Sequence, residues 1–398
     1  MITRLRIQNY KALRDVTLDL TPIHVLIGPN DTGKTSILEA VAALSRSADH
    51  SLGDAFSGVW DGTQLVWHGN TEQTIELSSV LSDPPINVEY QLCCVFSTRG
   101  RKVSVVKESA ITLHDGSGID LGGVGTLTNV RRLGLKYAQS NPLENWTPRV
   151  AASTICSLLK DVQFYRWVPS MLSLPTAQDA SRRFRMAPSG FGLALCLDDI
   201  LGYDRNAFVS LEARFRQIFP DLISIKLLPE SAYRAPVDQL PVPMLQKADG
   251  KGLHFEFGSF PSLVPASQVS DGTLLVLAYL SLLYLPKPPR FILVEEPENG
   301  IHPARLKEVL GILRELVHEQ SHTQVIMTTH SPYVLDMFKP DEVTLCTKQP
   351  DGSIAVKRLS DSKKVTEQLD VFTLGEIWTA EGDEALAADA GPAEEPGP

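Results

Sequence analysis

The sequence predicts an α/β protein with a buried core sheet, an antiparallel β subdomain and a mainly helical second lobe. Three observations support this fold class. A short apolar stretch, HVLIG (24–28), runs into a glycine-rich turn and then into a helical pattern. Two further apolar stretches, 291–296 and 323–329, each precede a helix signal. By contrast, residues 60–125 consist of short β-rich runs between turn signals, which is typical of an antiparallel sheet.

The composition excludes several protein classes. The 398 residues are 43% hydrophobic and 21% charged, as in folded globular chains of about two to three domains. The net charge is −10, but residues 379–398 contain six acids and no base, so no basic excess draws the chain onto nucleic acid.

Five cysteines without a C-x-x-C pair predict reduced thiols. The longest apolar run, 274–285, is shorter than the ~20 residues of a membrane span, and no signal peptide is evident, so a cytoplasmic protein without a membrane partner is expected.

The N-terminal half contains alternating strand patterns and helical patterns. Residues 2–8 and 12–20 alternate apolar and polar side chains around Asn9-Tyr10-Lys11 and predict a β-hairpin. Apolar residues at helical spacing predict a helix over 34–46. Residues 128–220 are predicted to be more helical, and short strands are expected again over 222–260.

The C-terminal half predicts a second set of buried elements. Residues 271–285 are apolar on all sides and predict a buried helix that stops at Pro286. Pro303 in a first turn predicts a helix that runs to about Glu319. Two short runs, 342–346 and 353–359, flank a turn and predict a hairpin.

The loop GPNDTGKT (28–35) fits G-x-x-x-x-G-K-[ST] in full and predicts a nucleotide site. Gly28 and Gly33 allow the backbone to curl so that amide groups face a phosphate. Lys34 brings a positive charge to the β and γ oxygens, and the Thr35 hydroxyl is the expected Mg²⁺ ligand. The cofactors expected are therefore ATP and Mg²⁺, and the remaining candidate contacts are Asn30, Asp31, Thr32 and Ser36.

Acidic residues and a histidine follow the two later strands. Glu295 and Glu296 end the strand 291–296, and we expect Glu295 to hold the metal and Glu296 to act as the base for the attacking water. His330 follows the strand 323–329, where its side chain can reach a γ-phosphate or the water. An acidic turn in solvent and a structural histidine are the alternatives.

The segment QVSDGT (268–273) opens the predicted buried helix. Ser270 is expected to cap this helix, and Gly272 exposes amides at its N-terminus, so the pair predicts a second anion site. Taken alone the signal is weak, because Ser-Asp-Gly is a common helix cap.

In this order, the phosphate loop, VSDGT, the EEPENGIHP run and TTH make the chain resemble ABC-type ATPase heads. The match is nearest to prokaryotic AAA-named, ABC-like ATPases related to the OLD family and to RecF and SMC heads. The opening RIQNYKALRDVTLDL and the segment LDVFTLGEIW (369–378) are also similar to such proteins, so the resemblance covers about 1–378.

The resemblance implies a P-loop NTPase head with a RecA-like core sheet, in which two heads dimerise head-to-tail around ATP. Lys34, Thr35, Glu295, Glu296 and His330 would act from one subunit, and Ser270 and Gly272 from the other. Asn299 to His302 would line the subunit junction. Three features depart from the usual pattern: glutamate replaces aspartate at 295, the signature is SDGT, and the glutamine sensor is uncertain between Gln163 and Gln91.

The resemblance also implies a domain division. Residues 1–130 are expected to begin the ATPase lobe, 131–268 to form the second lobe, 269–378 to complete the core, and 379–398 to be a disordered acidic tail. No nuclease is expected, because relatives with that activity append a Toprim domain after the head. A basic cluster is more typical of a solvated face than of a DNA-binding surface; it comprises Arg166, Arg182, Arg183 and Arg185.

The function implied is an ATP-driven switch in DNA repair or anti-phage defence. The alternatives are an ATP-gated regulator of a separately encoded effector with little turnover, and a transporter ATPase subunit. The last is disfavoured because 235 positions separate Ser270 from Thr35, far more than in transporter ATPases. DNA and an effector protein remain candidate partners beside a second copy of the chain.

Overall fold

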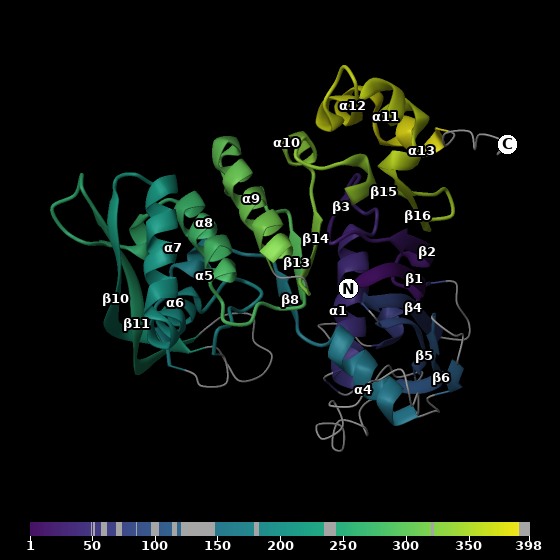
Figure 1. Cartoon of the computed structure of the whole chain (residues 1–398), viewed down its shortest axis with the longest axis horizontal. Helices are drawn as coiled ribbons and strands as arrows, with labels where there is room; N and C mark the ends of the chain where they lie inside the picture. Colours follow the sequence, from purple (N-terminus) through teal and green to yellow (C-terminus); the bar gives the residue numbers. More distant parts are fainter. Residues whose placement is uncertain are drawn as a thin grey trace. The chain divides into compact units, whose positions relative to one another are not determined.

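A computed structural model describes residues 1–48, 50, 52–56, 62–68, 74–84, 86–96, 103–113, 118–120, 148–178, 183–234, 244–319 and 322–389. The chain forms two compact units (Figure 1). The first unit comprises Met1–Gln163, Pro289–Leu293 and His322–Pro398, and the second comprises Phe164–Pro288 and Val294–Ser321. Both units are therefore discontinuous in sequence.

The first unit is organised by a six-stranded core sheet of order β16-β15-β3-β14-β13-β8, in which the last two residues of β8 and of β13 are assigned to the second unit. Strand β3 pairs in parallel with β14 on one side and with β15 on the other. Every residue of β3 and β14 is buried, as expected for parallel strands covered on both faces. The strands of this sheet are β3 (Ile23–Ile27), β8 (Val162–Tyr165), β13 (Phe291–Glu295), β14 (Gln324–Thr328), β15 (Val343–Lys348) and β16 (Ile354–Arg358).

A second sheet of the first unit is antiparallel and has the order β2-β1-β4-β5-β6-β7. Its side chains alternate between buried and exposed positions, so one face packs on the core and the other faces solvent. The predicted N-terminal hairpin and antiparallel subdomain are thus confirmed. The strands are β1 (Ile2–Tyr10), β2 (Leu13–Asp19), β4 (Thr74–Asp83), β5 (Ile86–Phe96), β6 (Val103–Thr112) and β7 (Gly118–Asp120).

Gln324 joins the two sheets of the first unit. Its side-chain oxygen accepts a hydrogen bond from the Ile2 amide at 2.9 Å, and its side-chain nitrogen donates to the Ile2 carbonyl at 2.8 Å. The same nitrogen also donates to Thr21. Because Gln324 is buried, these bonds fix the start of β1 beside the start of β14.

The helices of the first unit lie at three places along the chain. Helix α1 follows the phosphate loop, and α4 contacts α1 and β4. Helices α11, α12 and α13 gather beside β15 and β16 (Figure 1). The helices are α1 (Lys34–Ser47), α2 (Leu52–Phe56), α4 (Pro148–Leu159), α10 (Pro332–Leu335), α11 (Lys363–Gln368), α12 (Leu374–Glu381) and α13 (Asp383–Ala388).

The second unit packs helices against a long hairpin of β10 and β11 (Figure 1). Helix α8 is the centre of its core, since α8 is buried on nearly all sides and contacts α5, α6, α7 and α9. The helices are α5 (Pro169–Leu172), α6 (Leu193–Tyr203), α7 (Arg205–Ile218), α8 (Asp271–Leu283) and α9 (Pro303–Glu319). The strands are β9 (Thr176–Ala177), β10 (Leu222–Arg234), β11 (Met244–Phe257) and β12 (Val264–Pro265).

The structure divides the chain differently from the predicted boundaries at 130 and 268. The first unit extends to Gln163, and α8 and α9 belong to the second unit. The reason is packing, because the fully apolar α8 buries itself among the helices of the second unit. Residues 131–147 lie outside the described residues.

The expected disorder from residue 379 is also wrong for residues 379–389. Helix α12 continues to Glu381, and α13 buries Leu386. The Asp389 carboxylate accepts hydrogen bonds from the Ser362 hydroxyl at 2.7 Å and the Lys364 amide at 2.9 Å. These contacts anchor an acidic segment that composition alone assigns to a tail; residues 390–398 lie outside the described residues.

Candidate functional site

The phosphate loop, residues 28–35, lies between β3 and α1 in the first unit. The Gly28 backbone passes so close to the Cys346 backbone in β15 that only glycine fits there. Asp31 has a left-handed backbone with a φ of 61°, which aspartate tolerates. The loop therefore turns tightly onto the first turn of α1, where backbone N–H groups have no helical partner and can hold a phosphate.

Lys34 places a positive charge within this loop. Its Nζ donates hydrogen bonds to the carbonyl oxygens of Gly28 at 2.8 Å and Pro29 at 2.7 Å, and the residue is only 7% exposed. In the adjacent strand, burial raises the pKa of the Cys346 thiol to about 12, while the Lys34 charge acts in the opposite direction. The ammonium is thus held near the loop backbone, as binding of the β and γ phosphates requires.

The other predicted loop residues differ in exposure. Thr32 is buried, and its hydroxyl donates to the Pro29 carbonyl at 2.8 Å, which stabilises the turn. Asn30 and Asp31 are exposed, as is Thr35 in the first turn of α1, whereas Ser36 is half-buried. Thr35 therefore lies next to Lys34 on the side of the helix that faces solvent.

His330 lies at the same sheet edge as the phosphate loop. The parallel register pairs Thr328 with Leu26, and the Thr329 amide donates to the Leu26 carbonyl at 3.1 Å. Two residues after Leu26 the loop begins, and two residues after Thr328 comes His330, which is exposed. The expectation that the loop and the histidine share one edge is confirmed.

The second unit contains the two predicted carboxylates. Glu295 ends β13, and its side chain is 8% exposed, with Oε2 3.5 Å from Nε of Arg166. Glu296 has a φ of 47°, which is rare for a side chain and rarer before a proline. Asn299 holds its carboxylate, because the Asn299 side-chain amide donates to Oε2 of Glu296 at 2.5 Å. Such backbone strain is common at functional sites.

Ser270 caps helix α8 as the sequence predicts. Its hydroxyl accepts a hydrogen bond from the Thr273 amide at 3.2 Å, while Ser270 itself is exposed. A Cβ atom on Gly272 would lie 3.5 Å from the carbonyl oxygen of Gly300, so the start of α8 lies beside the loop that follows Glu296. Within that loop, the His302 ring accepts a hydrogen bond from the Ala304 amide at 3.2 Å. Their place at a subunit junction stays a prediction.

The residues of the first unit fit a nucleotide with its metal. A buried ammonium, a helix N-terminus and an adjacent hydroxyl are the donor set for phosphate and for a phosphate-bound Mg²⁺. Among the described residues, no group of three or more His, Cys, Asp or Glu side chains is placed to hold a metal ion by itself. A phosphate-bound metal needs no such group, because Mg²⁺ in these sites takes one or two protein ligands and substrate oxygens.

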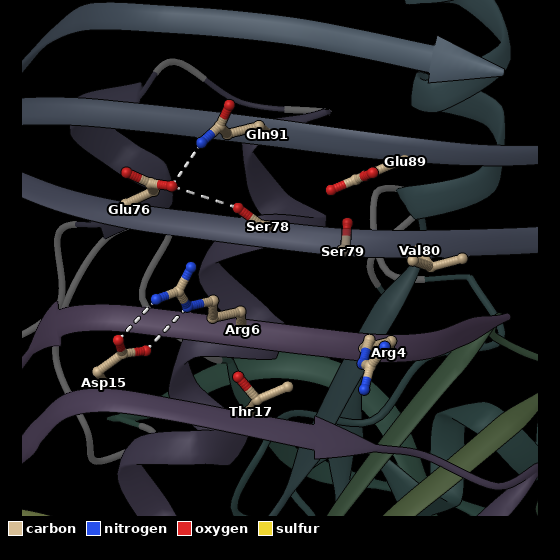
Figure 2. A pocket seen from close by; sticks show the side chains of 10 residues that line it. All are labelled: Arg4, Arg6, Asp15, Thr17, Glu76, Ser78, Ser79, Val80, Glu89 and Gln91. Atoms are coloured by element: carbon tan, nitrogen blue, oxygen red, sulfur yellow. Dashed lines mark hydrogen bonds and ion pairs between the residues drawn. The ribbon is translucent and has the colours of Figure 1, made fainter. Parts of the chain in front are cut away.

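A hollow of about 600 Å³ lies on the outer face of the antiparallel sheet (Figure 2). Arg6 and Asp15 face one another in it, with hydrogen bonds of 2.9 and 2.7 Å, and the Glu76 carboxylate accepts from Ser78 and Gln91. Arg6 is paired with Asp15 and Arg4 with Asp19, as on a solvated sheet face. Gln91, one of the two candidate sensors, therefore lines this hollow and not the phosphate loop.

Arg166 was predicted only as part of a basic cluster, yet its guanidinium lies beside the Glu295 carboxylate. It directly follows β8, whereas the other candidate sensor, Gln163, lies within that strand. Arg183 pairs with Asp199 at 4.0 Å, and Arg182 lies outside the described residues. The signal that could have identified Arg166 is a charged residue that directly follows a strand of the core sheet.

Comparison with known proteins identifies a family and two relatives that this chain resembles. A family model described as "AAA domain, putative AbiEii toxin, Type IV TA system" matches residues 23–336. The OLD nuclease of Thermus scotoductus is 24% identical, over 98% of this chain and 70% of that protein. The Old nuclease of Escherichia phage P2 is 24% identical, over 89% of this chain and 60% of that protein. The chain thus spans 60 to 70% of the length of these curated relatives.

Among solved structures, the Smc head domain with an extended coiled coil from Pyrococcus furiosus, bound to the C-terminal domain of ScpA, is similar in fold. The TM-score is 0.51 at 13% identity, over 93% of this chain and 99% of that one. This likeness shows the fold, an ABC-type P-loop head. In the described part of the chain, no helix has the length and apolar character to cross a membrane.

Proposed function

The chain belongs to this family of AAA domains, as an OLD-like ABC-type ATPase head, and from this premise we propose that it is a switch that binds and hydrolyses ATP. The observation that carries the proposal is the buried Lys34 ammonium, held by the carbonyls of a phosphate loop whose first glycine cannot be replaced. That arrangement suits a phosphate chain and little else.

Each residue of the proposed ATP site would have its own role. Lys34 and the amides at the start of α1 would hold the phosphates, and Thr35 and Glu295 would hold Mg²⁺. When bound, MgATP supplies an electrophilic γ-phosphoryl group whose charge the metal neutralises. The Glu296 carboxylate would orient a water molecule and take its proton, with Asn299 fixing the orientation of the carboxylate. His330 would hold the water or the γ-phosphate from the same sheet edge as the loop.

The switch is proposed to work through a head-to-tail dimer. Ser270 and Gly272 lie at an exposed helix N-terminus of the second unit, which suits contact with the nucleotide of another copy. ATP binding would close this dimer and hydrolysis would open it. The proposed setting is DNA repair or anti-phage defence, and the nuclease names of two relatives support a role connected with nucleic acid.

Whether the chain also cuts DNA is a separate question, because both curated relatives are named nucleases. The absence of nuclease activity from these 398 residues stays a prediction. Incubation of the purified protein with plasmid DNA and Mg²⁺ or Mn²⁺ tests it. Cleavage that survives further purification and disappears on mutation of the region after His330 would contradict it.

Calorimetry of ATP binding tests the proposed function. Lys34→Ala should abolish tight binding, whereas Lys363→Ala, which removes a lysine that is 61% exposed on α11, should leave the affinity unchanged. Equal affinity in the wild type and Lys34→Ala would contradict the site. Phosphate release by the wild type then separates a hydrolysing switch from an ATP-gated regulator, since only the first turns over.

A further inference from the structure

The second unit pairs a buried carboxylate with a cation that stays in water. Nε of Arg166 lies 3.5 Å from Oε2 of Glu295; the Arg166 side chain is 78% exposed and that of Glu295 only 8%. A carboxylate with so little access to water needs a cation nearby, since its own hydration is largely lost. The guanidinium loses little free energy when it leaves the carboxylate, because it is already hydrated.

We propose that Arg166 occupies the carboxylate of Glu295 before nucleotide arrives, and that Mg²⁺ must displace it. This inference rests on the proposed ATP site, in which Glu295 is a metal ligand. Two cations that need the same oxygens compete, so the guanidinium raises the Mg²⁺ concentration at which the site fills. Arg166 is thus a positioning residue that makes occupancy of the site depend on the metal.

The residues that follow Arg166 lie against helix α8 and its neighbouring loop, so displacement of Arg166 can affect that helix. The Trp167 ring packs on Tyr279 of α8 with centroids 4.5 Å apart. A Cβ atom on Gly300 would lie 3.8 Å from Pro169 and 3.0 Å from Leu275 of α8. Movement of Arg166 therefore acts on side chains that touch the helix whose start bears Ser270 and Gly272.

The buried side chain of Trp167 also indicates that this segment can adopt a second conformation. Its indole N–H is buried and finds no hydrogen-bond acceptor in the described ranges of the chain. A buried donor without an acceptor is unfavourable, so a rearrangement that supplies one is favoured. Because Trp167 follows Arg166 directly, its fluorescence should report the departure of the guanidinium.

The Mg²⁺ dependence of nucleotide binding tests the proposal. A non-hydrolysable ATP analogue is held at fixed concentration while Mg²⁺ is titrated and the bound fraction is measured. Arg166→Gln should lower the half-saturating Mg²⁺ concentration about 1.5- to fivefold, the range expected for loss of an ion pair whose cation is largely exposed. Arg166→Lys keeps the charge and should lie between Arg166→Gln and the wild type.

Arg183→Gln is the matched control, because Arg183 is 62% exposed and pairs with Asp199 in the same unit. It should titrate like the wild type. In a Glu295→Gln background, Arg166→Gln should have no further effect on the Mg²⁺ requirement, since the contested carboxylate is gone. The Trp167 fluorescence change on adding Mg²⁺ and analogue should be present in the wild type and absent from a Trp167→Phe variant.

The outcomes separate the two claims. If the wild type binds the analogue but Arg166→Gln needs the same or more Mg²⁺, the displacement model is wrong and the ATP site stands. A persistent effect of Arg166→Gln in the Glu295→Gln background also overturns it, because Arg166 would then act elsewhere. If the wild type binds no analogue at any Mg²⁺ concentration, the proposed function fails and this inference fails with it.

Discussion

A Cβ atom on Gly28 would come 2.1 Å from the carbonyl oxygen of Cys346. Gly28 is the first residue of the phosphate loop, and Cys346 lies on β15, which pairs in parallel with β3. The approach of these two backbones, 318 positions apart in the sequence, sets how the loop leaves the sheet. The first glycine of the motif is therefore required by the neighbouring strand as well as by the phosphate.

We expect Gly28→Ala to lose nucleotide binding and stability together. The added methyl group meets backbone that cannot move without disturbing β15, and the φ of 130° is unsuited to alanine. Overpacking of this kind costs about 1–3 kcal/mol of unfolding free energy. Thermal unfolding and calorimetry with ATP measure the two effects.

The control for that variant is Gly311→Ala, within helix α9, where an added Cβ atom meets nothing within 4 Å. Alanine there should raise stability by about 0.5–1 kcal/mol, because glycine is a poor helix former. Equal melting temperatures for Gly28→Ala and the wild type would contradict the close approach.

We expect the free energy of unfolding to decrease as the pH is lowered, because of His24. This histidine is fully buried in β3, with Nε2 2.9 Å from the Thr344 hydroxyl and Nδ1 3.0 Å from the Thr21 hydroxyl. Burial, together with the smaller effect of the nearby Arg358 charge, lowers its pKa to about 3. The ordinary pKa is about 6.5, so between pH 6.5 and 3 the unfolded chain takes up a proton that the native state does not. Stability is thus full above about pH 6.5 and is lost as the pH falls.

His24→Gln removes the titration and keeps hydrogen-bonding groups. Between pH 7 and pH 5, the wild type should lose about 2 kcal/mol more unfolding free energy than this variant. Urea unfolding at both pH values measures the difference. The exposed His318 is the control, since His318→Gln should follow the wild type. Parallel pH curves for His24→Gln and the wild type would show that His24 is not the source.

We expect Gly375 to help position His330, the histidine that follows β14. A Cβ atom on Gly375 would lie 2.3 Å from the Pro332 carbonyl oxygen, and its amide donates to the Asp336 carboxylate at 2.9 Å. Helix α12 thus begins against α10, which starts two residues after His330. Gly375→Ala should displace this turn and lower ATP turnover at least tenfold while ATP affinity is largely kept.

Turnover and ATP affinity of Gly375→Ala are measured on the same protein batch, with Gly202→Ala as the control, because a Cβ atom on Gly202 meets nothing within 4 Å. Wild-type turnover in Gly375→Ala would mean that the contact between α10 and α12 does not position His330. A loss of ATP affinity equal to the loss of turnover would point to general misfolding instead.

Local signals in the sequence were enough to predict much of this fold. The phosphate loop, the Ser270 cap and the N-terminal hairpin depend on short spacings that sterics and hydrogen bonding impose, and the structure has all three. The contacts between Gly28 and Cys346 and between Arg166 and Glu295 could not be predicted, because each joins segments more than a hundred residues apart.

The acidic composition of the C-terminal segment led to a wrong prediction of disorder up to residue 389. Six acids among the last twenty residues favour disorder, yet Leu386 is fully buried and Asp389 caps α11 through Ser362 and Lys364. Leu386 and the Asp389 carboxylate make specific contacts that hold this segment, and the Lys357 ammonium also donates to the Leu386 and Asp389 carbonyls. The strained backbone of Glu296 is likewise invisible in the sequence, since a glutamate before a proline predicts an extended conformation.

The last prediction concerns a site shared between two copies. Glu296→Gln keeps the shape of the proposed base but cannot take a proton, so the chemical step should slow about 10²–10⁴-fold while ATP binding persists. The protein should then accumulate as an ATP-bound dimer. Light scattering on Glu296→Gln at micromolar concentration, with and without ATP, measures the mass directly. A mass that stays at the monomer value at saturating ATP would contradict head-to-tail closure.

Ser270→Arg should bind ATP yet stay monomeric, because a bulky cation replaces an exposed helix cap at the proposed junction. Loss of a cap alone costs about 0.5–2 kcal/mol. Asp204→Ala controls for that cost, since Asp204 caps α7 in the same unit by accepting from the Asn206 and Ala207 amides. The Asp204 variant should still dimerise with ATP.

Mixing two inactive proteins then tests whether the site is built in trans. In a heterodimer of Lys34→Ala and Ser270→Arg, one interface combines both defects, and the other combines the intact phosphate loop of the Ser270 variant with the intact α8 start of the Lys34 variant. One complete site is therefore restored, and part of the ATP turnover should return in proportion to the heterodimer formed. Turnover in the mixture that equals the sum of the separate proteins would mean that Ser270 does not serve the nucleotide of another copy. This test remains informative if the protein is a dimer through another surface even without ATP, because only a shared site allows the two defects to complement each other.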